Sequence, residues 1–155
     1  MSPTQSPSSS RAQAAARKRR QGRVYALSLA YAWDQKHLQD DERLAIEGEP
    51  EDCNDAARRA GEEIFAGLVR ERAAVDAIID QRLTNWTLGR MAVLDRSILR
   101  LGCYELLYCE NVPPKVAINE YIEIAKIFGS DGKTAKLVNG VLDRISKDHR
   151  RPEGQ

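Results

Sequence analysis

Apolar side chains recur every three or four residues along most of this chain, which is the spacing that lines one face of a helix. The pattern is clearest from Arg90 to Cys109 and from Lys133 to Lys147. No segment shows the regular apolar and polar alternation of a half-buried strand. With 155 residues, the chain has the length of one ordinary domain and can bury a core without disulfides or metal. We therefore expect an all-α fold in one compact domain.

Proline and glycine set the ends of several predicted helices. A helical region runs from about Asn54 to Leu83, and Gly67 is a point at which this region can break. Pro113 and Pro114 suit the first turn of a later helix, because the first backbone N–H groups of a helix need no partner within it. Gly129 then ends that helix. The sequence thus predicts a series of separate helices joined by short loops.

The net charge is only +1, but the charges are segregated along the chain. Six basic residues and no acidic residue occur from Arg11 to Arg23, whereas the stretch from Asp40 to Asp55 is largely acidic. Residues Leu38 to Asp52 are predicted to form a loop. Clustered positive charge on an exposed helix favours nucleic acid, because each neutralised phosphate releases condensed counterions. A localisation signal, an acidic protein partner or a plain solvated surface also explains it.

Composition also bounds the domain and its compartment. Residues 1–10 are rich in Ser and Pro and are expected to form a disordered tail, as are residues 149–155, which leaves 11–148 as the helical domain. No apolar run approaches the roughly 20 residues needed to cross a bilayer. We expect a cytoplasmic protein with no membrane contact. A Ser-rich and Arg-rich start without acidic residues is also compatible with an organellar transit peptide.

No arrangement of residues predicts a metal site or a nucleophile. The cysteines Cys53, Cys103 and Cys109 form no CxxC pair, so no zinc site and no cofactor are expected. Cys103 and Cys109 have no histidine nearby in the sequence and are expected to be buried and structural. Glu120 and Glu123 lie one helical turn apart, as in di-metal bundles, but the histidine of the ExxH motif is missing. The sequence therefore gives no reason to expect an enzyme.

The segment from Gly129 to Thr134 ends like a phosphate-binding Walker loop. The motif requires a glycine where this chain has Ile127, and it follows a strand, whereas a helix is predicted here. Nucleotide hydrolysis is therefore not expected. Lys133, Lys136 and the first N–H groups of the last helix can still hold a phosphate of a larger ligand, and simple capping of the helix is the alternative.

Aromatic residues at helical spacing are expected to pack in the core rather than to stack on bases. These aromatic residues are Tyr25, Tyr31, Trp33 and Trp86. Tyr31 is also a candidate for a partner surface.

Five motifs occur in order along the chain: NW at residues 85–86, MAVLDRSILR at 91–100, YEL at 104–106, VPPKVAINE at 112–120 and VNGVLD at 138–143. With the basic helix that precedes Ala30 to Trp33, they make the chain resemble the NusB family of transcription antitermination factors from about Arg17 to Ser146. The resemblance implies about seven helices in two small bundles. It also implies a non-catalytic adaptor that needs no cofactor.

The resemblance further implies a set of partners. NusB proteins pair with NusE, a ribosomal protein of the small subunit, and the pair binds the boxA element of ribosomal RNA leaders. With NusA and NusG the pair helps RNA polymerase to resist termination, and it assists ribosomal RNA maturation. Some relatives form homodimers. Two alternatives stay open, a domain related to RNA cytosine methyltransferases and a module that binds only proteins; the first needs a following Rossmann-type domain, which is not expected because the chain ends at Gln155.

Site residues follow from the resemblance by position. The RNA surface would comprise Arg17, Lys18, Arg19, Arg20, Arg23, Lys133, Thr134, Lys136, Leu137 and Asn139. The NusE surface would comprise Tyr31, Asp95 and Arg96. Some relatives carry phenylalanine in place of Leu137 and a shorter preceding loop. Leucine can cover a base but cannot stack on it, so binding at this position is expected to be weaker.

Overall fold

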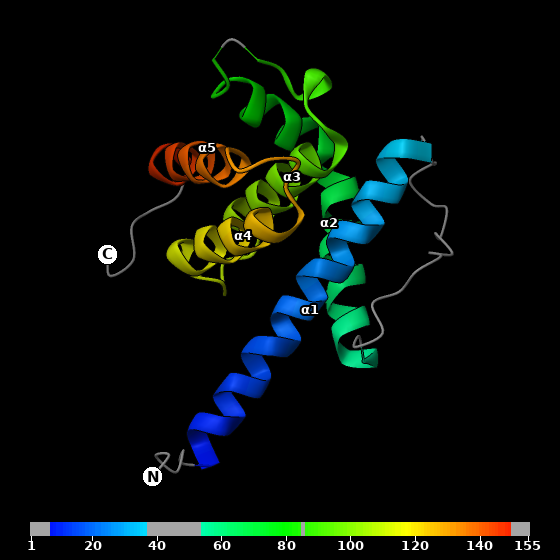
Figure 1. The fold of residues 1–155 in the computed structure, drawn as a ribbon, viewed down its shortest axis with the longest axis vertical. Coiled ribbons are helices and arrows are strands. Elements are labelled where there is room, and N and C mark those ends of the chain that lie inside the picture. The colour runs from blue at the N-terminus through cyan, green and yellow to red at the C-terminus, as the bar shows by residue number, and fades with distance from the viewer. Residues whose placement is uncertain (1–6, 37–53, 85, 150–155) are drawn as a thin grey trace.

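A computed structural model describes residues 7–36, 54–84 and 86–149 of the chain. Within these ranges the fold consists of helices only, which confirms the predicted all-α class (Figure 1). The elements are α1 (Pro7–Lys36), α2 (Asp55–Asp80), the short 3-10 helix η1 (Leu88–Arg90), α3 (Val93–Tyr108), α4 (Pro114–Phe128) and α5 (Thr134–His149). The described residues thus form five α-helices, and the expectation of about seven was wrong.

One reason for the lower number is that α2 continues through Gly67 without a break. A Cβ atom at this position would lie 1.8 Å from the hydroxyl oxygen of Tyr104. Gly67 therefore makes room for the Tyr104 ring against the helix instead of ending the helix. The sequence predicted a helix break because a glycine that makes room for a distant side chain cannot be told from a helix-ending glycine by its neighbours in the sequence.

Several helix ends agree with the sequence. The Asn54 side chain accepts a hydrogen bond from the Ala57 N–H at 2.9 Å and caps α2. Pro114 opens α4, which ends at Phe128 just before Gly129. Gly129 has φ −62°, so it is not needed for a left-handed backbone. It is needed for space, since a Cβ there would lie 2.5 Å from the Ala125 carbonyl oxygen.

The ends of the chain differ slightly from expectation. Helix α1 begins at Pro7, so residues 7–10 belong to it and not to a tail, and α5 extends to His149. The acidic loop from Leu38 to Asp52 lies outside the described residues, as do residues 1–6 and 150–155.

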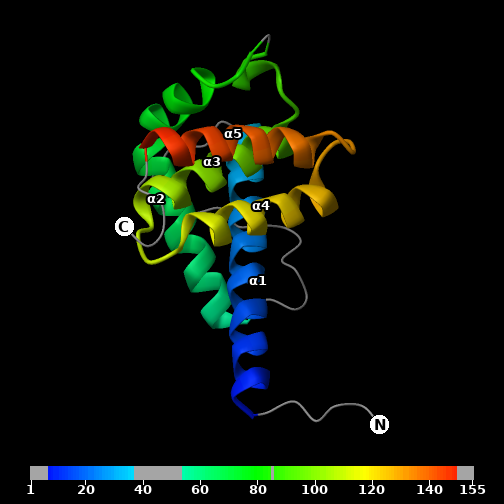
Figure 2. The ribbon, with the colours of Figure 1, turned by 90° about the vertical axis from the view of Figure 1, so that its left-hand side faces the viewer.

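Helix α3 lies at the centre of the fold and packs against each of the other four helices (Figures 1 and 2). Apart from Arg100, its residues from Ser97 to Leu106 are almost completely buried. One large apolar cluster joins Leu27 of α1, Leu68 of α2, Ile98 of α3, Tyr121 of α4 and Ile145 of α5. All five helices therefore share one core, and α3 holds them together.

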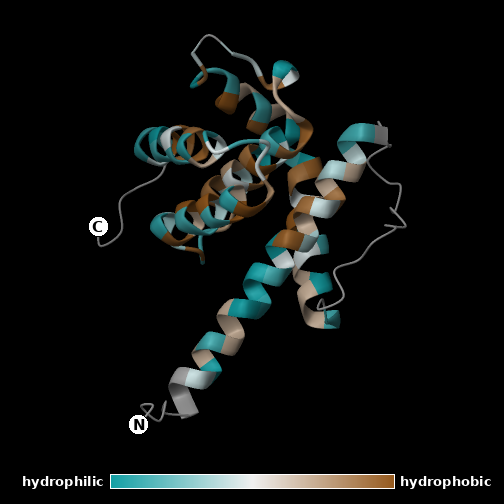
Figure 3. Ribbon diagram, viewed as in Figure 1, coloured by the Kyte–Doolittle hydropathy of each residue, from teal (hydrophilic) through white to brown (hydrophobic). Residues whose placement is uncertain are grey.

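The first half of α1 has a different character from the second half. It extends past the other helices in both views, and its surface is mostly hydrophilic (Figures 2 and 3). From Gly22 to Trp33 the helix is largely buried against α2 and α3. Among the described residues, no helix combines the length and apolar character that crossing a bilayer requires.

Candidate nucleic-acid interface

Three of the predicted RNA-binding residues lie on the projecting half of α1. Arg17, Lys18 and Arg19 are exposed, and no described residue forms an ion pair with any of them. The first acidic residue of the helix is Asp34. This half of α1 therefore presents positive charges that are free to meet phosphate groups.

Arg20 marks the boundary between the projecting half and the body. Its guanidinium donates to the carboxylate of Glu120 on α4, with 2.9 Å between Nε and Oε2 and 3.1 Å between Nη2 and Oε1. The Arg20 side chain remains 47% exposed. The hydrogen bond that Arg20 donates to Glu120 raises the pKa of Arg20 above its ordinary value, so the arginine stays charged. Phosphate can reach Arg20 only in competition with Glu120.

Arg23, which was predicted to contact RNA, lies in the core and not on an exposed surface. It is 4% exposed and forms a bidentate ion pair with the buried Glu105 of α3. The Tyr121 hydroxyl also donates to Glu105. Burial and the adjacent Glu105 charge raise the pKa of Tyr121 well above its ordinary value, which keeps this donor protonated. Arg23 therefore fixes α1 to the core.

The second predicted cluster lies at the beginning of α5. Lys133, Lys136 and Asn139 are exposed and Leu137 is half-buried. Thr134 is only 3% exposed, so it supports the turn rather than offering its side chain to a ligand.

Asp95 is the main support of the α4–α5 loop. Its carboxylate accepts from the Ser130 N–H at 2.9 Å and from the Ser130 hydroxyl at 2.6 Å. Asp95 is 8% exposed. Asp131 accepts from the Lys133 N–H at 2.7 Å, so the protein itself caps the start of α5. Both oxygens of Asp95 thus serve the loop, and its predicted contact with a protein partner stays a prediction.

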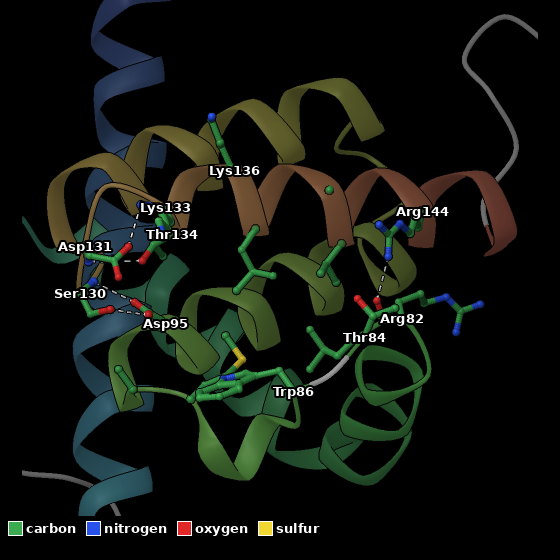
Figure 4. Close-up of a pocket in the computed structure, with 16 residues that line it drawn as sticks. Arg82, Thr84, Trp86, Asp95, Ser130, Asp131, Lys133, Thr134, Lys136 and Arg144 are labelled. Carbon is green, nitrogen blue, oxygen red and sulfur yellow. Dashed lines mark hydrogen bonds between the residues drawn. The ribbon is translucent and has the colours of Figure 1, made fainter.

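The start of α5 forms one wall of a groove of about 500 Å³ (Figure 4). The opposite wall comes from residues 82–84, which follow α2, from Trp86, Met91 and Ala92, and from Asp95 at the start of α3. Sixteen residues line it, namely Arg82, Leu83, Thr84, Trp86, Met91, Ala92, Asp95, Ser130, Asp131, Lys133, Thr134, Lys136, Leu137, Gly140, Val141 and Arg144. Four of the predicted RNA-binding residues thus lie together here, whereas Asn139 does not line the groove.

The structure does not join the two predicted basic features into one surface. The free half of α1 projects away from α5 in both views (Figures 1 and 2). The connection between them runs over α4, where Arg20 contacts Glu120. Any ligand that contacts both features has to cross α4.

The predicted partner residues lie near the far end of α1. Tyr31 is half-buried, and its hydroxyl accepts from the Gln35 amide at 2.8 Å. Arg96 forms a bidentate pair with Asp34, at 2.6 Å from Nε and 2.5 Å from Nη2. Arg100 also donates to Asp34, at 2.8 Å. Arg96 therefore has a strong internal partner that binds α3 to α1.

The structure also places the cysteine, glutamate and aromatic residues that the sequence singled out. Cys103 is fully buried, and burial raises the pKa of its thiol to about 12. Glu123 pairs with Lys126 at 2.9 Å. No group of residues in the described ranges could hold a metal ion. Tyr25 and Trp33 are buried as expected, but Trp86 is 49% exposed, which sequence spacing did not show.

A model of the NusB family matches residues 20–147 of this chain. The "Transcription antitermination protein NusB" of Bacillus licheniformis is 38% identical over 133 residues, which cover 84% of this chain and 98% of that protein. The protein of the same name from Fervidobacterium nodosum is 49% identical over 83 residues, which span 54% of this chain and 58% of that protein.

Two solved structures are similar to this fold. One is "T. maritima NusB", with a TM-score of 0.73 and 32% identity, covering 86% of this chain and 93% of that chain. The other is a chain from a crystal structure of the antitermination factors NusB and NusE in complex with dsRNA. Its TM-score is 0.67 and its identity is 27%, with coverage of 84% of this chain and 97% of that chain.

Proposed function

The chain belongs to the NusB family, and from that premise we propose that it acts as a transcription antitermination factor, a non-catalytic adaptor that binds RNA. Its ligand would be boxA RNA of ribosomal RNA leader transcripts, bound together with NusE. The adaptor would help RNA polymerase, with NusA and NusG, to resist termination in the cytoplasm and would aid ribosomal RNA maturation.

The observation that carries the proposal is the exposed charge of Arg17, Lys18 and Arg19, for which the described part of the chain provides no ion-pair partner. On α2, by contrast, the exposed Arg72 has an acidic neighbour, Asp76, on the same helix face. The projecting half of α1 has no such neighbour. A phosphate backbone is the ligand that best matches a row of unpaired cations, since it supplies regularly spaced negative charges.

Two further observations support an RNA ligand and a protein partner. Lys133 and Lys136 are exposed at the start of α5 and add a second region of positive charge. The solved structure that contains NusB, NusE and dsRNA has the same fold. A protein partner bound on α1 and α4 would bridge the space between the two basic regions, so that one RNA could contact both. NusE is the first candidate for this partner, and a second copy of this chain is the other.

The test is filter binding of a single-stranded boxA RNA at several salt concentrations, with and without purified NusE. The variant is Lys18→Ala/Arg19→Ala. The matched control is Arg59→Ala/Arg70→Ala, which removes the same charge from exposed positions on α2. Because each contact with a single strand contributes about 0.7 to the slope of log K against log salt, we expect the variant to lose about 1.4 from that slope.

The control variant should keep the wild-type slope, and NusE should tighten binding by the wild type. If the wild type binds no RNA in any of these conditions, the proposal fails and the basic helix belongs to a protein partner. If both double variants lose the same affinity, binding depends only on net charge and the assignment of α1 is wrong.

A further inference from the structure

The groove beside α5 contains an aromatic side chain that the core does not use. Trp86 lies in the segment between α2 and α3 and is 49% exposed, whereas Trp33 is 5% exposed and contacts Phe65 edge to face. Figure 4 shows Trp86 across the groove from α5, with Lys133 near the start of that helix and the Lys136 side chain directed away from Trp86. A half-exposed indole in a groove offers a flat face to a ligand.

We infer that this groove is a nucleobase subsite, in which an unpaired RNA base stacks on the Trp86 indole. The inference deepens the proposed RNA-binding function and rests on it. Stacking on an aromatic ring tolerates any base, because every base has a π face. The subsite would therefore add affinity for single-stranded RNA without reading its sequence.

The apolar surface of the groove suits a base. Met91 and Val141 line it and are almost completely buried, and half-buried Leu137 lines it as well. Leu137 can cover one face of a base but cannot stack on it. Trp86 lines the same groove and supplies the aromatic face that Leu137 lacks.

The charged residues of the groove favour a polyanion. Four cations line it, namely Arg82, Lys133, Lys136 and Arg144, against the two carboxylates of Asp95 and Asp131. Both carboxylates already accept hydrogen bonds from the α4–α5 loop and the start of α5. Lys133, Lys136 and Arg144 form no ion pair with any described residue. Within the described part of the chain, Arg144 donates only to the Arg82 carbonyl oxygen, at 3.0 Å, so phosphates on either side of a stacked base would meet these cations.

Gly140 leaves the space that the base would fill. It lines the groove in the middle of α5, and a Cβ atom there would meet nothing within 4 Å. A glycine inside a helix is less stable than alanine by about 0.5–1 kcal/mol, so an open glycine in this position is not explained by packing. Close approach of a ligand to the α5 backbone explains it.

The experiment uses single-stranded RNA oligonucleotides that carry one abasic ribonucleotide at each position in turn. Wild type should lose affinity at one position in particular, where the missing base is the one that stacks. Trp86→Ala should weaken binding of the intact RNA by about 5- to 150-fold and should remove the dependence on that position. Trp86→Phe should restore most of both, because phenylalanine also stacks.

Two further variants separate stacking from folding. Tyr108→Ala removes another half-exposed aromatic residue, 41% exposed on α3, and should leave RNA binding unchanged. Gly140→Leu should raise the stability of α5 by its better helix propensity while it fills the groove and weakens RNA binding. A loss of affinity together with a gain in stability cannot result from misfolding.

The outcomes distinguish this inference from the proposed function. If Lys18→Ala/Arg19→Ala loses RNA and Trp86→Ala does not, the function stands and the subsite is wrong. If Trp86→Ala weakens only the binding of NusE, the groove is a protein contact and the subsite is also wrong. If wild type binds no RNA at all, the proposed function fails first.

Discussion

Arg23 of α1 and Glu105 of α3 form an ion pair inside the core, with 2.9 Å between Nε and Oε2 and side-chain exposures of 5% and 2%. Burial alone would lower the pKa of Arg23, but the hydrogen bonds and charge of Glu105 outweigh burial and raise it. The pair joins the helix that carries the basic stretch to the centre of the fold. It thereby fixes the direction in which Arg17 to Arg19 project.

Removing one member of this pair should destabilise the protein strongly. Arg23→Met leaves the Glu105 carboxylate buried without its partner, and we expect the free energy of unfolding to fall by about 3–5 kcal/mol in urea titrations. Arg23→Met/Glu105→Gln should recover much of this loss, because glutamine is neutral and still accepts from Tyr121. Arg20→Ala, in the exposed pair, is the control and should cost less than about 1 kcal/mol. Equal losses in Arg23→Met and Arg20→Ala would contradict a structural role for the buried pair.

Neutralising Glu120 should strengthen RNA binding. Glu120→Gln removes the negative charge that competes with phosphate for Arg20, so Arg20 becomes available as a further contact. We expect tighter binding in filter assays and a salt slope larger by about 0.7. The control Glu63→Gln removes one exposed carboxylate from α2 and should change the slope much less. Weaker binding by Glu120→Gln would mean that Glu120 positions Arg20 for RNA instead of competing for it.

Stability at acidic pH should depend on Asp34. Burial would raise the pKa of Asp34, but hydrogen bonds and charges from Arg96 and Arg100 outweigh burial and lower the pKa below its ordinary 3.8. A lowered pKa in the folded state contributes stability above pH 3.8, and this contribution is lost as the pH falls through the folded pKa.

Asp34→Asn should therefore be less stable than wild type near neutral pH, and the difference should shrink as the pH falls below 3.8. Urea unfolding of both proteins across that pH range measures the change. Asp143→Asn, which removes a carboxylate from an exposed pair with Lys147, is the matched control for loss of one charge. A difference between wild type and Asp34→Asn that stays constant with pH would rule out this role for Asp34.

Glycine substitutions should have opposite effects at two helical positions. A Cβ at Gly61 of α2 would lie 2.6 Å from the Gly22 carbonyl oxygen of α1, so Gly61→Ala forces the two helices apart. We expect a loss of about 1–3 kcal/mol in the free energy of unfolding. Gly140→Ala meets open space and should stabilise by about 0.5–1 kcal/mol. Thermal unfolding of both variants checks the signs, and stabilisation by Gly61→Ala would show that α1 and α2 do not pack this closely.

Local features of the fold could be predicted from the sequence because they depend on near neighbours. The helical spacing of apolar residues predicts the helices found at Val93–Tyr108 and Thr134–His149. Pro114 and Gly129 set the limits of α4 through their own backbone properties and the space around them. The family also follows from ordered motifs that need no three-dimensional information.

The sequence by itself therefore determined the fold class, the family and the presence of a basic helix, since charge clustering and apolar periodicity depend only on the order of the residues. Only the tertiary structure decided which of those charges are free. Arg23 and Arg20 lie three residues apart in one basic stretch, yet one is buried against Glu105 and the other is half-exposed beside Glu120. Their partners are 82 and 100 residues away, and the exposure of Trp86 likewise depends on how distant helices pack.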